Sequence, residues 1–150
     1  MTTYNFVTRN CSNCSHSNTV QILTSTNAMG SYDLDLRPPP MQRFTMDSWI
    51  EICENCGFVW HDLGDQKIDK NIIQDVMTSE QWIYLSSKEF ILSLNFEKYA
   101  LMCIALAGAK EEALAYKYAA WAADDEFNEV KATVYRLKAV NAFCLSLIHI

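Results

Sequence analysis

The sequence predicts an α+β fold in which a β-rich segment over residues 1–66 precedes an all-helical region over residues 67–144. In the first segment, β-branched and aromatic residues surround two cysteine turns, and this composition favours strands. From residue 67, apolar residues recur at helical spacing, which favours helices. The connections between the last three periodic stretches are short, so we expect these helices to pack as antiparallel neighbours.

Composition and charge limit the class of protein. At 150 residues the chain suffices for one ordinary domain or two small ones, and its 50% hydrophobic content is that of a globular protein. The formal net charge of −6 argues against a general affinity for nucleic acid, which needs clustered lysine and arginine. The sequence has no apolar run of roughly 20 residues, as a membrane span needs, and no apolar stretch of a secretory signal. We therefore expect a cytoplasmic protein with reduced thiols.

Four of the six cysteines form two identically spaced pairs, Cys11-x-x-Cys14 and Cys53-x-x-Cys56. Thiolates hold Zn²⁺ tetrahedrally, and a two-residue gap lets both sulfurs of one turn reach the same ion. Gly57 follows the second pair, where such a turn needs a positive φ angle or a close backbone approach. The intervening residues 15–52 form a long insertion, which costs little because loop-closure entropy grows slowly with length. We predict one structural zinc ion bound by all four cysteines.

Other interpretations of the cysteines and histidines stay open. Two independent redox CxxC motifs, or unrelated buried cysteines, would show the same spacing. His16 could replace one sulfur, although four cysteines already complete the coordination shell. We expect His61 to be a surface residue of a strand, and Cys103 and Cys144 to act as small hydrophobic residues in helices.

Each cysteine turn lies between two candidate strands. The sequences YNFVTR and TVQIL flank the first turn, and SWIEI and FVWHDL flank the second. A strand, a cysteine turn and a second strand, present twice, form the arrangement of a zinc ribbon. Between the two halves, Pro38 to Pro40 cannot continue a helix and predict extended polyproline geometry.

Three charged residues, Asp33, Asp35 and Arg37, precede these prolines. They could form a binding surface or a second acidic centre. Alternatively, Arg37 pairs with an aspartate and pins the loop against the ribbon. The second interpretation is favoured, because two aspartates at positions i and i+2 supply too few oxygen ligands for a calcium loop.

The helical region starts with two stretches whose N-cap candidates are Asp69 and Ser79, and KEFILSL, residues 88–94, continues the helical tendency. Three stronger stretches follow over residues 96–110, 110–125 and 127–143. Each carries a predicted apolar face. The faces consist of Phe96, Tyr99, Ala100, Cys103 and Ile104; of Leu114, Tyr118 and Trp121; and of Val130, Val134, Leu137 and Phe143.

The first two of these stronger helices resemble one tetratricopeptide repeat. Gly108 falls at the turn between them, and Ala113 and Ala120 match the small positions that allow close helix packing. A generic helical hairpin would show a similar pattern. Together, CSNC, DLDLRP, CENCGFV and KYAAWAADD resemble an uncharacterised bacterial family that joins an N-terminal four-cysteine zinc ribbon to a tetratricopeptide-like helical region. The resemblance implies zinc binding by the four cysteines and no particular activity.

These features predict a non-enzymatic, zinc-binding protein-interaction module. A site of four cysteines leaves no coordination position for water or substrate, so its ion stabilises the fold. Helical hairpins of this kind usually present a groove to a protein or peptide partner. One alternative is a nucleic-acid-associated zinc ribbon, which the acidic charge of residues 1–66 disfavours. The other is a CxxC thiol–disulfide oxidoreductase.

The last six residues, LSLIHI, follow the final periodic stretch without a helix-capping signal. One reading frame of the transposon end sequence used in DNA-library preparation translates to this hexapeptide. We therefore interpret residues 145–150 as a non-native sequencing scar, and expect an independently sequenced locus to differ after residue 144. On this interpretation His149 has no functional role, and further helices would cover the exposed apolar face of the last one.

Overall fold

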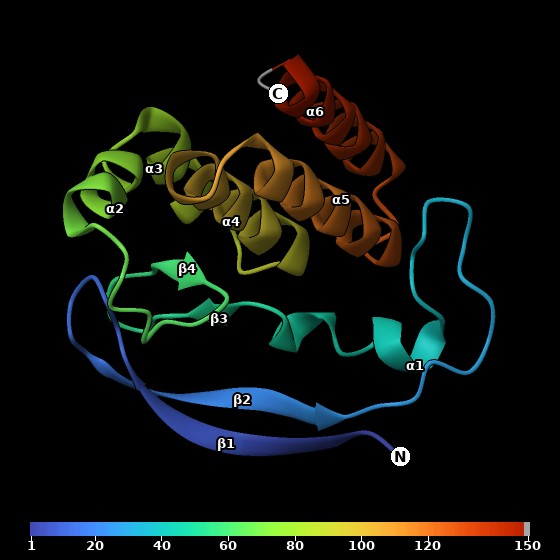
Figure 1. Cartoon of the computed structure of the whole chain (residues 1–150), viewed down its shortest axis with the longest axis horizontal. Helices are drawn as coiled ribbons and strands as arrows, with labels where there is room; N and C mark the ends of the chain where they lie inside the picture. Colours follow the sequence, from blue (N-terminus) through green and yellow to red (C-terminus); the bar gives the residue numbers. More distant parts are fainter. Residues whose placement is uncertain (149–150) are drawn as a thin grey trace.

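The computed structural model describes residues 1–148, in which two β-hairpins precede a set of helices (Figure 1). The strands are β1 (Thr3–Asn10), β2 (Ser17–Ser25), β3 (Glu51–Ile52) and β4 (Val59–Trp60). β1 pairs with β2, and β3 pairs with β4, as two separate antiparallel sheets. Asn10 lies opposite Ser17 and Ile52 lies opposite Val59, so each hairpin closes around one CxxC turn. The predicted order of strand, cysteine turn and strand therefore occurs twice, although β3 and β4 cover only two residues each of the predicted stretches SWIEI and FVWHDL.

The helices are α2 (Lys70–Met77), α3 (Glu80–Ser86), α4 (Leu92–Leu106), α5 (Ala109–Asp125) and α6 (Glu129–Ile148). Both predicted N-caps are confirmed. The Asp69 carboxylate accepts a hydrogen bond from the main-chain nitrogen of Asn71 at 2.9 Å. Ser79 Oγ accepts one from the main-chain nitrogen of Trp82 at 3.3 Å. The mixed fold class, with a small β-containing region followed mostly by helices, follows the prediction.

The segment KEFILSL departs from its predicted helical state, because residues 88–91 lie outside both α3 and α4. Ile91 is extended, with φ −124° and ψ 147°. The Glu126 carboxylate accepts hydrogen bonds from the main-chain nitrogen of Ser93 at 2.8 Å and from its hydroxyl. The first N–H groups of a helix have no intrahelical acceptor. A contact from a distant segment therefore favours the observed start of α4, and the local sequence pattern could not reveal it.

The connection between the hairpins contains α1 (Pro40–Arg43) and a 3₁₀ turn, η1 (Met46–Ser48). Pro39 is extended as predicted, with φ −61° and ψ 161°, but Pro40 is the first residue of α1. The extended prediction is wrong at Pro40, because proline is well accommodated at the first helical position, where its missing N–H costs nothing. The loop before α1 runs beside the ends of α5 and α6 in Figure 1.

The hairpins and the helices share one hydrophobic core. The Trp60 ring in β4 meets the Tyr99 ring in α4 edge-on, with centroids 5.5 Å apart. Trp49 meets Tyr118 of α5 in the same way, at 5.2 Å. Buried residues from both regions belong to one cluster. The predicted segments 1–66 and 67–144 therefore pack against each other through buried aromatic side chains.

Small residues allow α5 to pack closely against its neighbours α4 and α6. Ala113 and Ala120, the small positions identified in the sequence, are both 0% exposed. Gly108 joins α4 to α5 with φ +99°, a conformation that L side chains rarely adopt. Its N–H donates a hydrogen bond to the Cys103 carbonyl at 2.8 Å, which satisfies one carbonyl at the end of α4.

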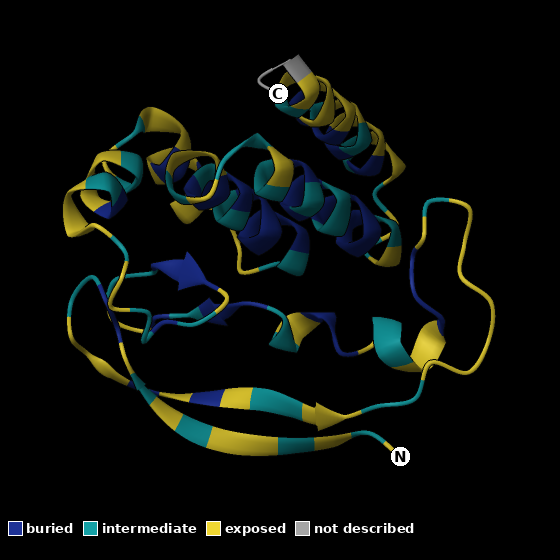
Figure 2. Cartoon of the chain, in the orientation of Figure 1, coloured by how far each residue is buried: buried dark blue, intermediate teal, exposed yellow. Residues whose placement is uncertain are grey.

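The predicted apolar face of α6 does not pack against α5. Val130, Val134, Leu137 and Phe143 are exposed. The buried residues of this helix are Ala132, Tyr135, Ala139 and Ala142, on the side facing α5 (Figure 2). Ile104, predicted on the buried face of α4, is also 45% exposed. The apolar face of the last helix is therefore exposed, as expected, while the alanines of α6 permit its close approach to α5.

Residues 145–148 continue α6, while residues 149–150, including His149, lie outside the described residues. The interpretation of 145–150 as a sequencing scar stays a prediction. Within residues 1–148, no helix has both the length and the apolar character needed to cross a membrane.

Candidate metal centre

The two CxxC turns bring four sulfur atoms together. Sγ of Cys11 lies 3.7 Å from Sγ of Cys56, and Sγ of Cys14 lies 3.6 Å from Sγ of Cys53. All four sulfurs lie within 4.8 Å of one another. A tetrahedral ion with Zn–S bonds of about 2.3 Å requires sulfur pairs about 3.8 Å apart. The four cysteines therefore lie close enough to hold one metal ion, and their spacing fits thiolate coordination.

The backbones of the two turns repeat the same geometry. The Ser15 nitrogen donates to the Cys11 carbonyl at 2.8 Å, and the Gly57 nitrogen donates to the Cys53 carbonyl at 2.9 Å. Ser15 and Gly57 both have positive φ angles, of 62° and 75°. The predicted conformation of Gly57 is confirmed, while Ser15 adopts the same region despite its side chain. These turns direct the two sulfurs of each pair towards a common centre.

Two asparagines that the sequence analysis missed support the sulfurs. Asn13 Nδ2 lies 3.5 Å from Sγ of Cys56, and Asn55 Nδ2 lies 3.5 Å from Sγ of Cys14. Each asparagine precedes the second cysteine of one turn and donates to the second cysteine of the other. Amide donors lower the energy of a thiolate, so both residues favour the metal-binding form. The shared x-Asn-Cys ending of the two motifs was the available signal.

A third asparagine, Asn18, joins the two turns from the start of β2. It is 2% exposed, and its Nδ2 donates to the His16 carbonyl at 2.9 Å and lies 3.6 Å from Sγ of Cys53. Its Oδ1 accepts a hydrogen bond from the main-chain nitrogen of Glu54 at 3.0 Å. The side chain is therefore satisfied by both turns at once, and it holds their backbones at a fixed distance.

Burial and hydrogen bonding act oppositely on the thiols. Burial raises the pKa of Cys11 and of Cys56 above the ordinary value. For Cys14, partial burial would also raise the pKa, but hydrogen bonds led by that from Asn55 lower it to about 6. Burying several thiolates together is costly without a cation, because both desolvation and mutual repulsion oppose ionisation. A bound cation would therefore stabilise the thiolate forms of these four cysteines.

Within residues 1–148, the remaining cysteines and histidines lie outside this cluster. His16 is exposed and is not a member of the four-residue group, and His61 is exposed just after β4. Cys103 is buried in α4, as predicted for a small hydrophobic residue. Cys144 is exposed on α6, so the same prediction is wrong for it.

The acidic loop makes a separate set of contacts with the helices. Arg37 is 8% exposed and donates to the Trp121 carbonyl at 3.1 Å. Its guanidinium also pairs with Asp124 at 3.7 Å and with Asp125. The predicted pairing of Arg37 with an aspartate is confirmed, but the predicted contact with the ribbon is wrong. Both aspartates belong to α5, which local sequence could not indicate.

Asp35 completes this attachment. Its carboxylate accepts hydrogen bonds from Trp121 Nε1 at 2.8 Å and from Arg136 Nη2 at 3.2 Å. Partial burial opposes ionisation, but these hydrogen bonds, one from the Arg37 main chain and the charge of Arg136 together lower the pKa of Asp35 below its ordinary value. Asp33 instead pairs with Arg43, the last residue of α1, at 3.1 Å. The three charged residues thus hold the loop in place, which favours their structural interpretation over a second acidic centre.

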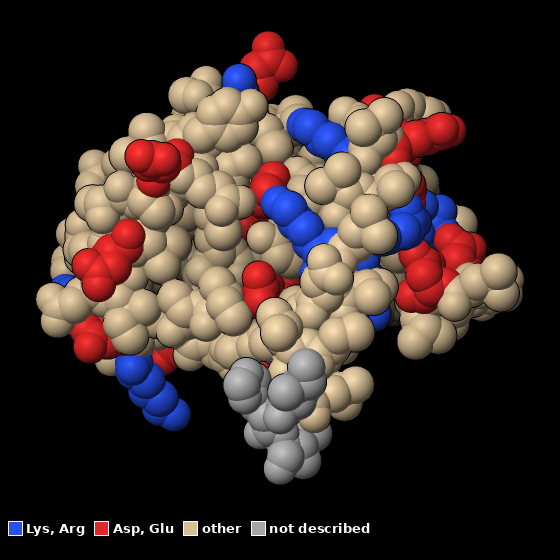
Figure 3. All heavy atoms as spheres, turned by 90° about the horizontal axis from the view of Figure 1, so that it is seen from above, with Lys and Arg blue, Asp and Glu red and all other residues tan. Residues whose placement is uncertain are grey.

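Comparisons of the chain with protein-family models, curated proteins and solved structures found no match. The resemblance to a bacterial zinc-ribbon family therefore remains a prediction. On the face that Figure 3 views, basic and acidic side chains of the described residues are interspersed, without a continuous basic area.

Proposed function

We propose that the chain is a non-enzymatic, cytoplasmic protein-interaction module whose ribbon is stabilised by one zinc ion. The observation that carries the zinc assignment is the four-sulfur cluster of Cys11, Cys14, Cys53 and Cys56. A ligand set made only of thiolates favours zinc over magnesium or calcium, which prefer oxygen. The two crossed asparagine contacts support it further, because donors to the sulfurs stabilise their ionised form.

A structural role for the ion follows from its ligand count. Four protein ligands complete the tetrahedral shell of zinc and leave no position for water or substrate. The site also lies at the meeting point of both hairpins, where one ion would join segments 11–14 and 53–56. Zinc binding of this kind contributes directly to the free energy of folding. This argument supports the absence of catalysis at the metal centre.

The interaction role rests on the helices. Val130, Val134, Leu137 and Val140 of α6 are exposed at helical spacing and form one apolar stripe. Grouped exposed apolar residues mark interaction surfaces more often than isolated ones do. In a tetratricopeptide-like array, such a face would contact a neighbouring helix or a partner protein. A partner protein that covers this stripe is therefore the binding role we propose.

Metal analysis of the purified chain tests the central claim. We expect one zinc per chain by native mass spectrometry, and loss of the ion in Cys53→Ser. Cys144→Ser is the matched control, because it removes an exposed cysteine of α6 and should retain the ion. A chain that is fully folded without metal would contradict the proposal, as would a Cys53→Ser variant that keeps its zinc.

A further inference from the structure

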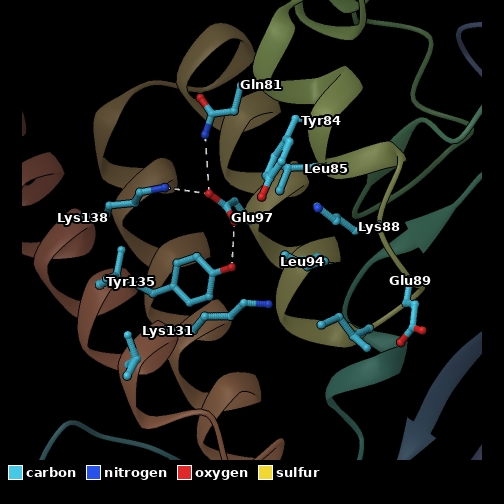
Figure 4. A pocket seen from close by; sticks show the side chains of 13 residues that line it. Gln81, Tyr84, Leu85, Lys88, Glu89, Leu94, Glu97, Lys131, Tyr135 and Lys138 are labelled. Atoms are coloured by element: carbon cyan, nitrogen blue, oxygen red, sulfur yellow. Dashed lines mark hydrogen bonds and ion pairs between the residues drawn. The ribbon is translucent and has the colours of Figure 1, made fainter.

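A cavity of about 640 Å³ lies between α3, α4 and α6, away from the metal centre (Figure 4). Leu85, Ile91 and Leu94 contribute apolar side chains on the α3–α4 side. Val130 and Val134 contribute the apolar wall of α6. Its volume falls within the range typical of small-molecule sites, which are mostly apolar and contain a few polar groups that fix orientation.

One carboxylate in the cavity is already satisfied. Glu97 is 8% exposed, and its Oε2 accepts a hydrogen bond from the Tyr135 hydroxyl at 2.7 Å. Its Oε1 pairs with Lys138 Nζ at 2.6 Å and lies 3.5 Å from Gln81 Nε2. Lys138 is therefore neutralised by Glu97. The two residues fix the wall of the cavity and add no net charge to it.

Two further lysines are not neutralised in this way. Within residues 1–148, neither Lys88 nor Lys131 forms an ion pair. Figure 4 shows their amino groups pointing into the same space from opposite sides, Lys88 from the segment between α3 and α4 and Lys131 from α6. The Tyr84 hydroxyl points towards this space as well. Of the charged groups lining the cavity, only Glu89 offers an opposing charge besides Glu97.

The chemistry of the lining determines what fits. Ammonium groups donate hydrogen bonds and cannot accept them, so their complement is an anion that only accepts. An ionised carboxylate meets this condition, and the apolar lining would cover an aliphatic body attached to it. A peptide fits less well, because its main-chain N–H groups would face leucine, isoleucine and valine without acceptors.

We propose that this cavity binds a small aliphatic carboxylate, with the carboxylate between Lys88 and Lys131 and the alkyl chain against Leu94 and Val134. This binding site shares Val130 and Val134 with the apolar stripe assigned above to a partner protein, but its ligand is a different one, and it does not depend on the zinc ion's identity. It also gives the cavity a specific ligand class, defined jointly by charge and by chain length.

Octanoate is a suitable probe, titrated into the full, metal-loaded chain and followed by amide chemical shifts. We expect saturable binding, with the largest shifts in α3, α4 and α6. Octanol tests the need for the charge, octyltrimethylammonium tests its sign, and acetate tests the need for the alkyl chain. Each should bind at least about tenfold more weakly than octanoate, a difference of about 1.4 kcal/mol. Equal binding of octanol or acetate, or no saturable binding of octanoate, would overturn the proposal.

Variants locate the site and its charge requirement. Lys88→Gln and Lys131→Gln should each weaken octanoate binding about tenfold, while Lys110→Gln, an equal charge change at the exposed start of α5, should not. Because Lys88 is exposed and Lys131 is half-buried, we expect all three variants to fold, and circular dichroism checks this. Unchanged affinity in both cavity variants contradicts the assignment. Saturable binding of an acidic, aliphatic peptide in place of octanoate would also overturn it and reassign the cavity to a protein partner.

Discussion

The side-chain amide of Asn13 lies 3.5 Å from Sγ of Cys56, so a residue of the first cysteine turn supports a sulfur of the second. Asn55 repeats this contact in the opposite direction, to Cys14. The two turns are therefore related by an approximate two-fold symmetry that includes their hydrogen bonds as well as their sulfurs. The asparagine amide of each turn donates a hydrogen bond to a cysteine sulfur of the other turn and thereby stabilises the thiolate form of that cysteine. The two halves of the site are therefore coupled.

The crossed asparagines predict a measurable effect on metal affinity. Asn13→Ala and Asn55→Ala should each weaken metal binding by about 10-fold to 100-fold, because each removes a donor to a coordinating sulfur. Competition with a chromophoric chelator measures the change. Asn5→Ala, an exposed substitution in β1, serves as the control and should leave affinity unchanged. Wild-type affinity in both turn variants would show that these contacts contribute nothing to binding.

The helix starts at Asp69 and Ser79 were predictable because each depends on residues a few positions apart. The four-cysteine cluster was predictable because the same CxxC spacing, which is local, occurs twice in the chain. The partner of Arg37 was not, since Asp124 and Asp125 lie far away in sequence and nothing local distinguishes them from other acidic residues. The face by which α6 packs on α5 was not predicted either, for a related reason. Its buried residues are mostly alanines, whose weak hydrophobicity is outweighed in any pattern by exposed valine and leucine. Tertiary contacts decide both features.

The motifs DLDLRP and WAADD contact each other in the fold. Asp35 of the first motif accepts a hydrogen bond from Trp121 of the second. Arg37 of the first motif donates to the Trp121 carbonyl and pairs with Asp124 and Asp125. Arg37→Ala should lower the free energy of unfolding by about 2 kcal/mol, since it removes several charge-assisted hydrogen bonds from a buried position. Urea denaturation measures this. Arg43→Ala breaks a more exposed pair with Asp33 and should cost less than about 1 kcal/mol. Equal costs for the two variants would show that the Arg37 contacts have no special weight.

Asp35 predicts a pH dependence of stability. Its pKa is lower in the folded chain than in the unfolded chain, because Trp121 and Arg136 donate to the ionised form. The stabilisation of the folded chain by ionised Asp35 is therefore fully present above the pKa of Asp35 in the unfolded chain, at about pH 4. It is lost as the pH falls through the lower pKa that Asp35 has in the folded chain. The melting-temperature gap between the wild type and Asp35→Asn should narrow as pH falls from about 6 to about 3. Asp75→Asn, an exposed change in α2, controls for net charge, and a constant gap for Asp35→Asn would contradict this account.

The acidic composition predicts no functional affinity for nucleic acid. The formal net charge is −6, and electrostatic attraction to phosphate supplies most of the sequence-independent binding energy of DNA-binding proteins. Fluorescence anisotropy should detect no binding of DNA or RNA at about 150 mM salt. A specific complex that forms at submicromolar concentration would instead favour the nucleic-acid alternative for the ribbon.

Removal of the metal should destabilise the ribbon before the helices. β3 and β4 are two residues each, so we expect their hairpin to depend on the proposed ion between residues 11–14 and 53–56. Hydrogen exchange after treatment with a chelator should show early loss of protection in both hairpins, and later loss in α5 and α6. Tryptophan fluorescence should also change as the hairpins open. The reason is that the rings of Trp60 and Trp49, which contact Tyr99 and Tyr118, would then leave the shared core. A chain that keeps its hairpin protection after verified metal removal would show that packing on α4 and α5 alone holds the ribbon in place.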